Sequence, residues 1–260
     1  MNAFAGRVVL LTGAGGGLGR EFARQLLAAG ADLILSSHHP QRLSAAAEFA
    51  AQSPNRYGRI RSLLPADLSD PASCDHLAER VLRIAPDLDL VIHNAGVGLY
   101  GPLEALPVEA AERLLRINLH APIRLTARLL PALRNRPRSQ IVFISSILDW
   151  AALPNISVYS ATKFALRGFA DGLAADGYCV STVYPFFTQT DILESPQYGT
   201  TQRRVPGWMI DRPRPVVRAS LAGIAARRHH IYPGWKARLY AITAVVAPAV
   251  LPPFSRLVAG

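Results

Sequence analysis

The chain has 260 residues, of which 50% are hydrophobic and 18% are charged, and its formal net charge is +10. This apolar content is enough for a substantial core, so the composition excludes wholesale disorder. The two cysteines, Cys74 and Cys179, exclude a disulfide scaffold and a cysteine-rich metal site. We expect both to be buried thiols in a protein of the reducing cytoplasm.

Short apolar runs alternate with helical periods along the chain. In chain order, the runs that predict strands are residues 7–11, 32–36, 60–64, 88–93, 140–145, 178–184 and 230–232. The expected helices are residues 18–29, 40–52, 71–84, 108–134, 158–175 and 216–227. Pro122 and Pro131 should kink or break the long fourth helix. The alternation predicts an α/β fold in which about seven parallel strands form one doubly wound sheet, covered by helices on both faces.

A glycine-rich turn joins the first strand to the first helix. It runs from Thr12 to Gly19 and contains Gly13, Gly15, Gly16, Gly17 and Leu18. Glycines allow a tight turn, let a pyrophosphate approach the backbone and let the helix pack closely on the strand. The free N–H groups of a helix N-terminus bind phosphates. In this context the motif predicts a dinucleotide site, and the alternative is a merely tight turn.

The end of the second strand bears on which dinucleotide is bound. An acidic residue there favours NAD, but the chain has Ser36, Ser37, His38 and His39. No carboxylate would repel a 2′-phosphate, and His38 and Arg42 would attract one, so we expect NADP rather than NAD. The alternative is an ordinary polar turn. No carboxylate or thiol cluster accompanies the histidine pairs in the sequence, so no metal site is expected.

Tyr159 and Lys163 lie four residues apart, on one face of an expected helix. A phenol has a reference pKa of about 10, which is too high for efficient proton transfer at neutral pH. A fixed positive charge lowers that pKa, so the pair predicts a proton-transfer group, with a surface helix pair as the alternative. Ser145 and Ser146 end the preceding strand, where a hydroxyl either binds a substrate oxygen or is satisfied by the backbone.

Taken together, these motifs resemble the short-chain dehydrogenase/reductase family over residues 4–192. Further matches follow the third and fourth strands, and another lies in the long helix; they are Asp67, Leu68, Asn94, Ala95, Gly96 and Asn118. Ser146 stands thirteen residues before Tyr159, the family's usual spacing, which favours it over Ser145. Phe186 departs from the family, which has glycine after the proline at this position, so we expect a different pocket beside the nicotinamide.

The resemblance implies a Rossmann-type fold and hydride transfer between a nicotinamide and a substrate carbon. Tyr159 would be the general acid or base, and Lys163 would lower the pKa of its phenol and hold the nicotinamide ribose. Ser146 would orient the substrate oxygen, and Asn118 would anchor a water that links Lys163 to solvent. The expected cofactor contacts are Gly13, Gly15, Gly16, Gly17, Leu18, Gly19, Ser37, His38, Arg42, Asp67, Leu68, Asn94, Ala95, Gly96, Tyr159, Lys163, Pro185 and Thr190.

We expect residues 1–260 to form a single domain, in which residues 186–215 cover the substrate and residues 239–260 are an apolar extension. Aromatic side chains in the covering loop indicate an apolar carbonyl or alcohol substrate, unless they only pack the loop. Residues 203–238 carry nine Lys or Arg against Asp211 alone. With the apolar extension, this basic stretch indicates peripheral membrane contact, and the alternative is a solvated basic face.

No nucleic-acid motif is present in the sequence, so no nucleic-acid partner is expected. The resemblance implies a homodimer or homotetramer, because the family commonly pairs through helices. A catalytically inactive nucleotide-binding regulator or scaffold protein is the alternative to an enzyme, and Phe186 is the residue that favours it.

Overall fold

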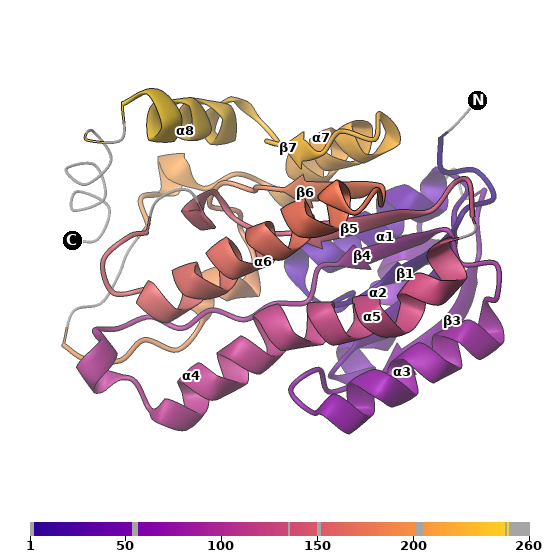
Figure 1. Ribbon diagram of the computed structural model, residues 1–260, viewed down its shortest axis with the longest axis horizontal. Helices are drawn as coiled ribbons and strands as arrows, with labels where there is room; N and C mark the ends of the chain where they lie inside the picture. The colour runs from indigo at the N-terminus through magenta and orange to yellow at the C-terminus, as the bar shows by residue number, and fades with distance from the viewer. Residues whose placement is uncertain are drawn as a thin grey trace.

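The computed structural model describes residues 3–53, 57–134, 136–149, 152–200, 205–247 and 249. Its centre is a seven-stranded sheet in the order β3-β2-β1-β4-β5-β6-β7, with every neighbouring pair parallel (Figure 1). The strands are β1 (Val8–Leu11), β2 (Asp32–Ser37), β3 (Ile60–Pro65), β4 (Leu90–His93), β5 (Gln140–Ile144), β6 (Val180–Val183) and β7 (His230–Ile231). The predicted doubly wound parallel sheet is confirmed.

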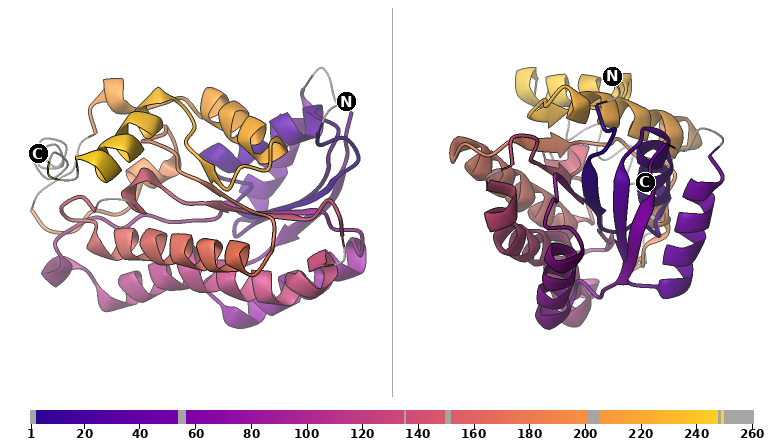
Figure 2. Two further views of the ribbon diagram at one scale, coloured as in Figure 1. Left: turned by 45° about the horizontal axis from the view of Figure 1, so that its top comes forward. Right: turned by 90° about the vertical axis from the view of Figure 1, so that its right-hand side faces the viewer.

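Helices cover both faces of the sheet (Figure 2). The helices are α1 (Gly17–Ala28), α2 (Pro40–Ala51), α3 (Pro71–Ile84), α4 (Val108–Leu115), α5 (Ala121–Arg134), α6 (Ser157–Ala175), α7 (Pro213–Ala225) and α8 (Trp235–Val246). One buried core joins α1, α2 and α7 to the sheet, and a second joins α3, α5 and α6 to its other face. Strands such as β1 are buried along their whole length, which explains their unbroken apolar sequences.

The strand order reverses between β1 and β4. The chain winds outward from β1 to β3 and then crosses back, so that β4 pairs with β1 on its other side. Loops that leave neighbouring strands in opposite directions open a crevice at their carboxyl ends, where ligands bind in such folds. The glycine-rich turn after β1 and the Asn94 segment after β4 therefore meet at this point.

In place of the single helix expected over residues 108–134, the structure has three consecutive helical segments. Between α4 and α5, residues Arg116–His120 form a π-helical segment, η2. Pro122 follows it and has no N–H to donate to the carbonyl of Asn118, which disfavours a regular α-helix here. Pro131 does not end α5, which continues to Arg134. A break at Pro131 is therefore contradicted, and the alternative of a kink there stays a prediction.

Two further helices differ from their predicted limits. Helix α7 starts three residues earlier than expected, at Pro213, because proline suits the first position of a helix. Most of the apolar run predicted over residues 239–260 belongs to α8 as far as the structure describes it, and residues 250–260 lie outside the described residues. Among the helices that the structure describes, none is long and apolar enough to cross a membrane.

Candidate active site

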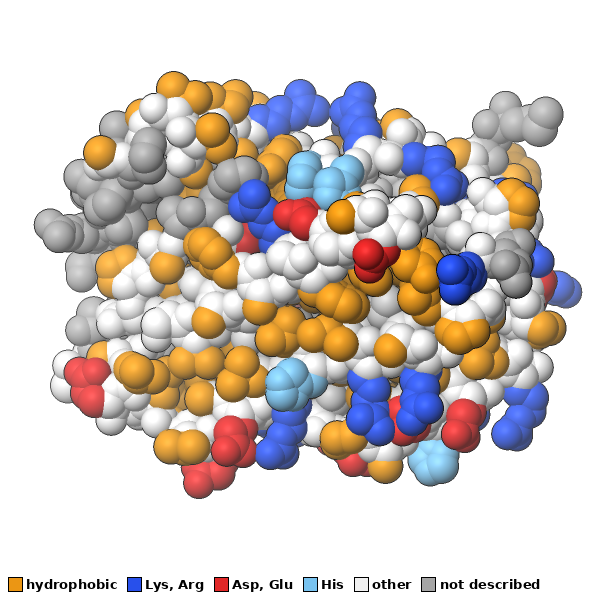
Figure 3. All heavy atoms as spheres, in the orientation of Figure 1, with side chains coloured by type: hydrophobic (Ala, Val, Ile, Leu, Met, Phe, Trp, Pro, Cys, Tyr) orange, Lys and Arg blue, Asp and Glu red, His pale blue; other side chains and the backbone are white. Residues whose placement is uncertain are grey.

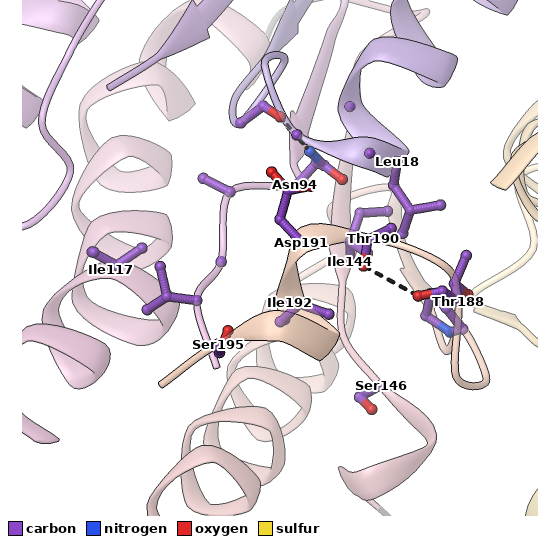
Figure 4. Close-up of a pocket in the computed structure, with 18 of the residues that line it drawn as sticks. Leu18, Asn94, Ile117, Ile144, Ser146, Thr188, Thr190, Asp191, Ile192 and Ser195 are labelled. Atoms are coloured by element: carbon purple, nitrogen blue, oxygen red, sulfur yellow. Dashed lines mark hydrogen bonds between the residues drawn. The ribbon is translucent and has the colours of Figure 1, made fainter. Parts of the chain in front are cut away.

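A cleft of about 360 Å³ opens at the carboxyl ends of the central strands. Figure 4 shows part of its lining, contributed by α1, η2, β5 and the segment around Thr190. The cleft brings together most of the predicted site residues: Gly13, Gly16, Gly17, Leu18, Gly19, Ser37, His38, Arg42, Asp67, Leu68, Asn94, Ala95, Gly96, Ser146, Tyr159, Lys163, Pro185 and Thr190. Gly15 lines an adjoining hollow with Arg42. Asn118 is fully buried behind the wall.

The glycines of the turn serve two different purposes. A Cβ on Gly19 would lie 2.0 Å from the Gly13 carbonyl oxygen, and one on Gly13 would lie 2.6 Å from Ala95 Cα, so packing within the chain demands glycine at both positions. A Cβ on Gly16 would meet nothing nearer than 3.6 Å. Gly16 faces the cleft and precedes α1, whose N-terminus has no side-chain cap. Its missing side chain and the free N–H groups therefore fit a phosphate-bearing ligand.

The segment after β4 clamps the turn. The Asn94 side chain donates from Nδ2 to the carbonyl oxygens of Thr12 and Gly13, each at 3.0 Å. The Thr12 hydroxyl accepts from the backbone N–H groups of Asn94 and Ala95 at 3.1 and 3.2 Å. These bonds hold the two loops on either side of the reversal at a fixed separation.

Charged groups gather at the ends of β2 and β3. His38 lies 3.7 Å from Asp67, measured between Nδ1 and Oδ2, and Arg42 donates to Asp191 at 2.6 Å. Burial pushes the pKa of Asp67 upward, but the backbone and hydroxyl bonds from Ser69 outweigh it and leave this pKa lowered. Both Arg42 and Asp191 are exposed, and this ion pair joins α2 to the loop after β6.

Lys163 is buried at the base of the cleft, directly beside Tyr159. Its Nζ donates to the Ile144 carbonyl oxygen at 3.1 Å and lies 5.6 Å from the centre of the Tyr159 ring. Burial lowers the pKa of Lys163 to about 8, against the raising effect of the Asp149 charge. The ammonium is thus mostly charged at neutral pH while lying in a dry environment, where its field on the phenol is strong.

Ser145 and Ser146 point to different partners at the end of β5. The Ser145 hydroxyl donates to Asp149 Oδ2 at 2.9 Å and is committed to that buried carboxyl. The Ser146 Oγ accepts from the backbone N–H of Leu148 at 3.2 Å, which leaves its proton available for another acceptor. Ser146 also lies in the labelled lining of the cleft (Figure 4), as the predicted spacing to Tyr159 requires.

Asn118 lies in the π-helical segment η2. Its side-chain amide donates to the Val97 carbonyl oxygen and accepts from the Val97 N–H, both at 2.9 Å. Such π segments are rare and often occur at functional sites. The amide of Asn118 thus holds the backbone of Val97, the residue after Gly96. Gly96 lies close to Lys163, because a Cβ on Gly96 would be 3.7 Å from Lys163 Nζ. Asn118 therefore fixes the position of the backbone that lies beside Lys163.

Asp149 is a buried acid that the sequence did not single out. It is fully buried, and its Oδ1 has no hydrogen-bond partner among the residues that the structure describes, which do not include 150 and 151. Burial raises the pKa of Asp149 to about 7, although the bond from Ser145 and the charges of Arg167 and Lys163 lower it. No local pattern marks such a residue, because only the tertiary fold buries it beside Ser145.

The pH dependence of stability should reveal this carboxyl. The unfolded group titrates near pH 4, so between pH 4 and 7 the folded state binds more protons and stability falls as pH rises, by at most about 1.4 kcal/mol per pH unit. Asp149→Asn should remove this loss and raise the unfolding temperature at pH 8. Thermal unfolding across pH 5–8.5 measures it, with the exposed Asp176→Asn as control. A difference from wild type that is independent of pH would contradict the assignment.

The histidine pair His229 and His230 does have a carboxylate neighbour. Asp171, from α6, lies 2.9 Å from His229 Nε2, and Arg167 lies 3.7 Å from the same carboxylate. This group is separate from the residues that line the cleft. The absence of a metal site stays a prediction.

Aromatic rings line part of the cleft. Phe186 and Phe187 line it and pack edge to face, with ring centres 5.0 Å apart. Phe186 also meets Tyr240 of α8, at 6.3 Å between centres. Phe186 is buried, so the ring that replaces glycine takes up space in the cleft and connects it to the C-terminal helix.

Comparison with known proteins agrees with this geometry. A family model for short chain dehydrogenases matches residues 7–198. The chain belongs to the short-chain dehydrogenase family. The resemblance inferred from the motifs is thus confirmed.

Two solved structures and one curated relative illustrate this family membership. A short-chain dehydrogenase from Sphingobium yanoikuyae in complex with NADPH has a TM-score of 0.74 and 27% identity, covering 94% of this chain and 95% of that one. One from Burkholderia cenocepacia in complex with NADP has a TM-score of 0.78 and 26% identity, covering 96% and 97%. The dehydrogenase/reductase SDR family member 7B of Rattus norvegicus is 34% identical over 171 residues, which are 65% of this chain but only 53% of that protein.

Proposed function

We propose that this short-chain dehydrogenase is an NADP-dependent oxidoreductase acting on an apolar carbonyl or alcohol. The observation that carries the proposal is the buried ammonium of Lys163 beside the Tyr159 phenol, in the same cleft as a turn suited to binding phosphate. A protein that only binds nucleotides has no need of a charged lysine held in a dry position against a phenol.

The proposed mechanism divides the work between cofactor and chain. A bound nicotinamide dinucleotide supplies or accepts the hydride. In the reduction direction, Tyr159 donates its proton to the substrate oxygen, and Lys163 stabilises the phenolate that is left. Ser146 donates a second hydrogen bond to the same oxygen. Its hydroxyl proton is available for this because its Oγ accepts from the backbone N–H of Leu148. Asn118 positions the backbone that flanks Lys163. That it also anchors a water linking Lys163 to solvent is proposed from the family resemblance.

The residues present fit such a dinucleotide. The free N–H groups at the start of α1 would donate to the phosphates, for which Gly16 leaves space. Asp67 and Leu68, which also line the cleft, would meet the adenine. Thr190 lines the cleft and lies beside the first residue of α1, since a Cβ on Gly17 would be 2.8 Å from the Thr190 methyl group; that Thr190 meets the nicotinamide end is proposed from the family resemblance. The two related structures named above hold NADPH and NADP, and a third, from Burkholderia phymatum, is in complex with NAD, so the relatives support a nicotinamide cofactor of either kind. We favour NADP over NAD because no acid directly follows β2.

A substitution at Arg42 tests the cofactor preference. Arg42→Ala should weaken NADPH binding about tenfold and leave NADH binding unchanged, because only the 2′-phosphate uses the guanidinium. Asp191→Asn is the matched variant: it removes the carboxylate that now holds Arg42 and should strengthen NADPH binding. Dissociation constants from cofactor fluorescence measure both effects. Equal losses for the two cofactors in Arg42→Ala would contradict the preference.

The substrate side is proposed from its lining. Phe186, Phe187, Ile192 and Leu193, all from the covering loop at residues 186–215, line the cleft and support an apolar substrate. Residues 201–204 of that loop lie outside the described residues. We also keep as proposals a single domain over residues 1–260, a homodimer or homotetramer and a cytoplasmic location.

A turnover assay tests the function directly. NADPH oxidation is followed by absorbance with a panel of aldehydes and ketones of increasing apolar size, and NADP reduction with the matching alcohols. We expect turnover that rises with apolar size. Tight NADPH binding without turnover on any member of the panel would favour the inactive nucleotide-binding protein, for which the bulk of Phe186 beside the nicotinamide site is the supporting observation.

A further inference from the structure

Helix α8 has an apolar face that the rest of the described chain leaves uncovered. Trp235, Leu239, Ile242 and Val246 are 56–77% exposed. At 100° per residue these positions fall within an arc of about 60°, so they form one stripe along the helix. Trp208 is also exposed, and its backbone lies near the first turn of α8, since Lys236 donates to the Trp208 carbonyl oxygen at 2.8 Å.

Basic residues are in excess in the part of the chain that carries this stripe. Among residues 205–247, seven Lys or Arg stand against one acid, Asp211, which is already paired with Lys236 at 2.8 Å. Two exposed arginines are tied to α8: Arg238 lies on the helix itself, and Arg212 follows Asp211, the partner of Lys236. Figure 3 shows hydrophobic side chains over α8 and Lys or Arg side chains along the same upper edge of the molecule. Arg203 and Arg204 of the predicted basic stretch lie outside the described residues.

We propose that α8 docks this protein on the surface of an anionic lipid bilayer, with the Trp235–Val246 stripe in the interface and Arg212 and Arg238 on the headgroups. An apolar stripe with Trp at its edge and Lys or Arg beside it is typical of helices that lie in the plane of a membrane interface. The excess of basic over acidic side chains selects an anionic surface over a second copy of this chain, because a second copy would bring the same positive charge to the contact.

The inner face of α8 connects this surface to the cleft. Ala237, Tyr240 and Ala241 are buried, and the Tyr240 ring contacts Phe186 of the cleft wall. One helix thus separates the docking stripe from the substrate end of the site. If the proposed function holds, an apolar substrate would enter from the lipid; docking itself does not depend on catalysis.

Cosedimentation with vesicles tests the docking. The full chain is mixed with vesicles of phosphatidylglycerol and phosphatidylcholine, or of phosphatidylcholine alone. We expect binding to the anionic vesicles at low salt that weakens as salt rises. Ile242→Glu should reduce the partition coefficient at least about tenfold, because it removes apolar area and places a negative charge against the lipid.

Val108→Glu is the matched control, because Val108 is equally exposed but lies on α4, at the opposite edge of the molecule in Figure 1. It should bind vesicles as the wild type does. Three results would overturn the proposal. The first is no sedimentation with anionic vesicles at low salt, and the second is an equal loss of vesicle binding in both variants. The third is a wild-type protein that binds no vesicles but forms a dimer, which Ile242→Glu dissociates. None of these results bears on NADPH turnover, which is measured separately without lipid.

Discussion

Replacing Tyr159 by Phe should lower kcat/KM about 10³-fold while leaving NADPH binding intact. The substitution removes only the hydroxyl, so the ring still packs beside Lys163 and the cleft keeps its shape. General acid–base catalysis by a positioned group contributes typically 10²–10⁴-fold. Tyr57 is exposed and is not among the residues that line the cleft, so Tyr57→Phe is the matched control. Steady-state kinetics with the best substrate of the panel measures the loss.

A second readout does not need a substrate. The ultraviolet difference spectrum between wild type and Tyr159→Phe during a pH titration reports where this phenol ionises. Lys163→Met should move that ionisation to higher pH, because the neighbouring positive charge is gone. An unchanged kcat/KM in Tyr159→Phe, or an ionisation that ignores Lys163→Met, would sink the proton-transfer assignment.

Local patterns account for the parts of this site that the sequence could predict. Tyr159 and Lys163 are one helical turn apart, so their meeting follows from helix geometry alone. The glycine turn is likewise local, because it directly connects the end of β1 to the start of α1. Because these features need no distant partner, their placement in one cleft required only the parallel sheet, which the alternation of elements had predicted.

Features made by distant pairs escaped prediction. Arg42 and Asp191 are 149 residues apart and meet across the cleft. Asp149 became a buried acid because α6 and α8 close over it, which its neighbours in the sequence do not indicate. The π segment containing Asn118 had a local cause in Pro122, but the sequence predicted a kink rather than the type of helix that resulted.

Two substitutions in the glycine turn should separate packing from ligand binding. Gly19→Ala puts a Cβ 2.0 Å from the Gly13 carbonyl oxygen, which cannot yield because Asn94 and the Gly16 N–H both hydrogen-bond to it. We expect a loss of about 3 kcal/mol in the free energy of unfolding, or roughly 6–12 °C in unfolding temperature, and with it a loss of dinucleotide binding.

Gly16→Ser is the matched variant in the same turn. Gly16 has an extended backbone at the N-cap of α1, where Ser is a favoured residue, and its Cβ would meet nothing nearer than 3.6 Å. Its stability should therefore equal or exceed that of wild type, whereas NADPH binding should fall because the hydroxymethyl group takes the space left for a phosphate. Chemical denaturation and cofactor fluorescence measure the two quantities. If Gly16→Ser bound NADPH normally, or if Gly19→Ala unfolded at the wild-type denaturant concentration, the division of the turn into a packing glycine and a phosphate-facing glycine would be wrong.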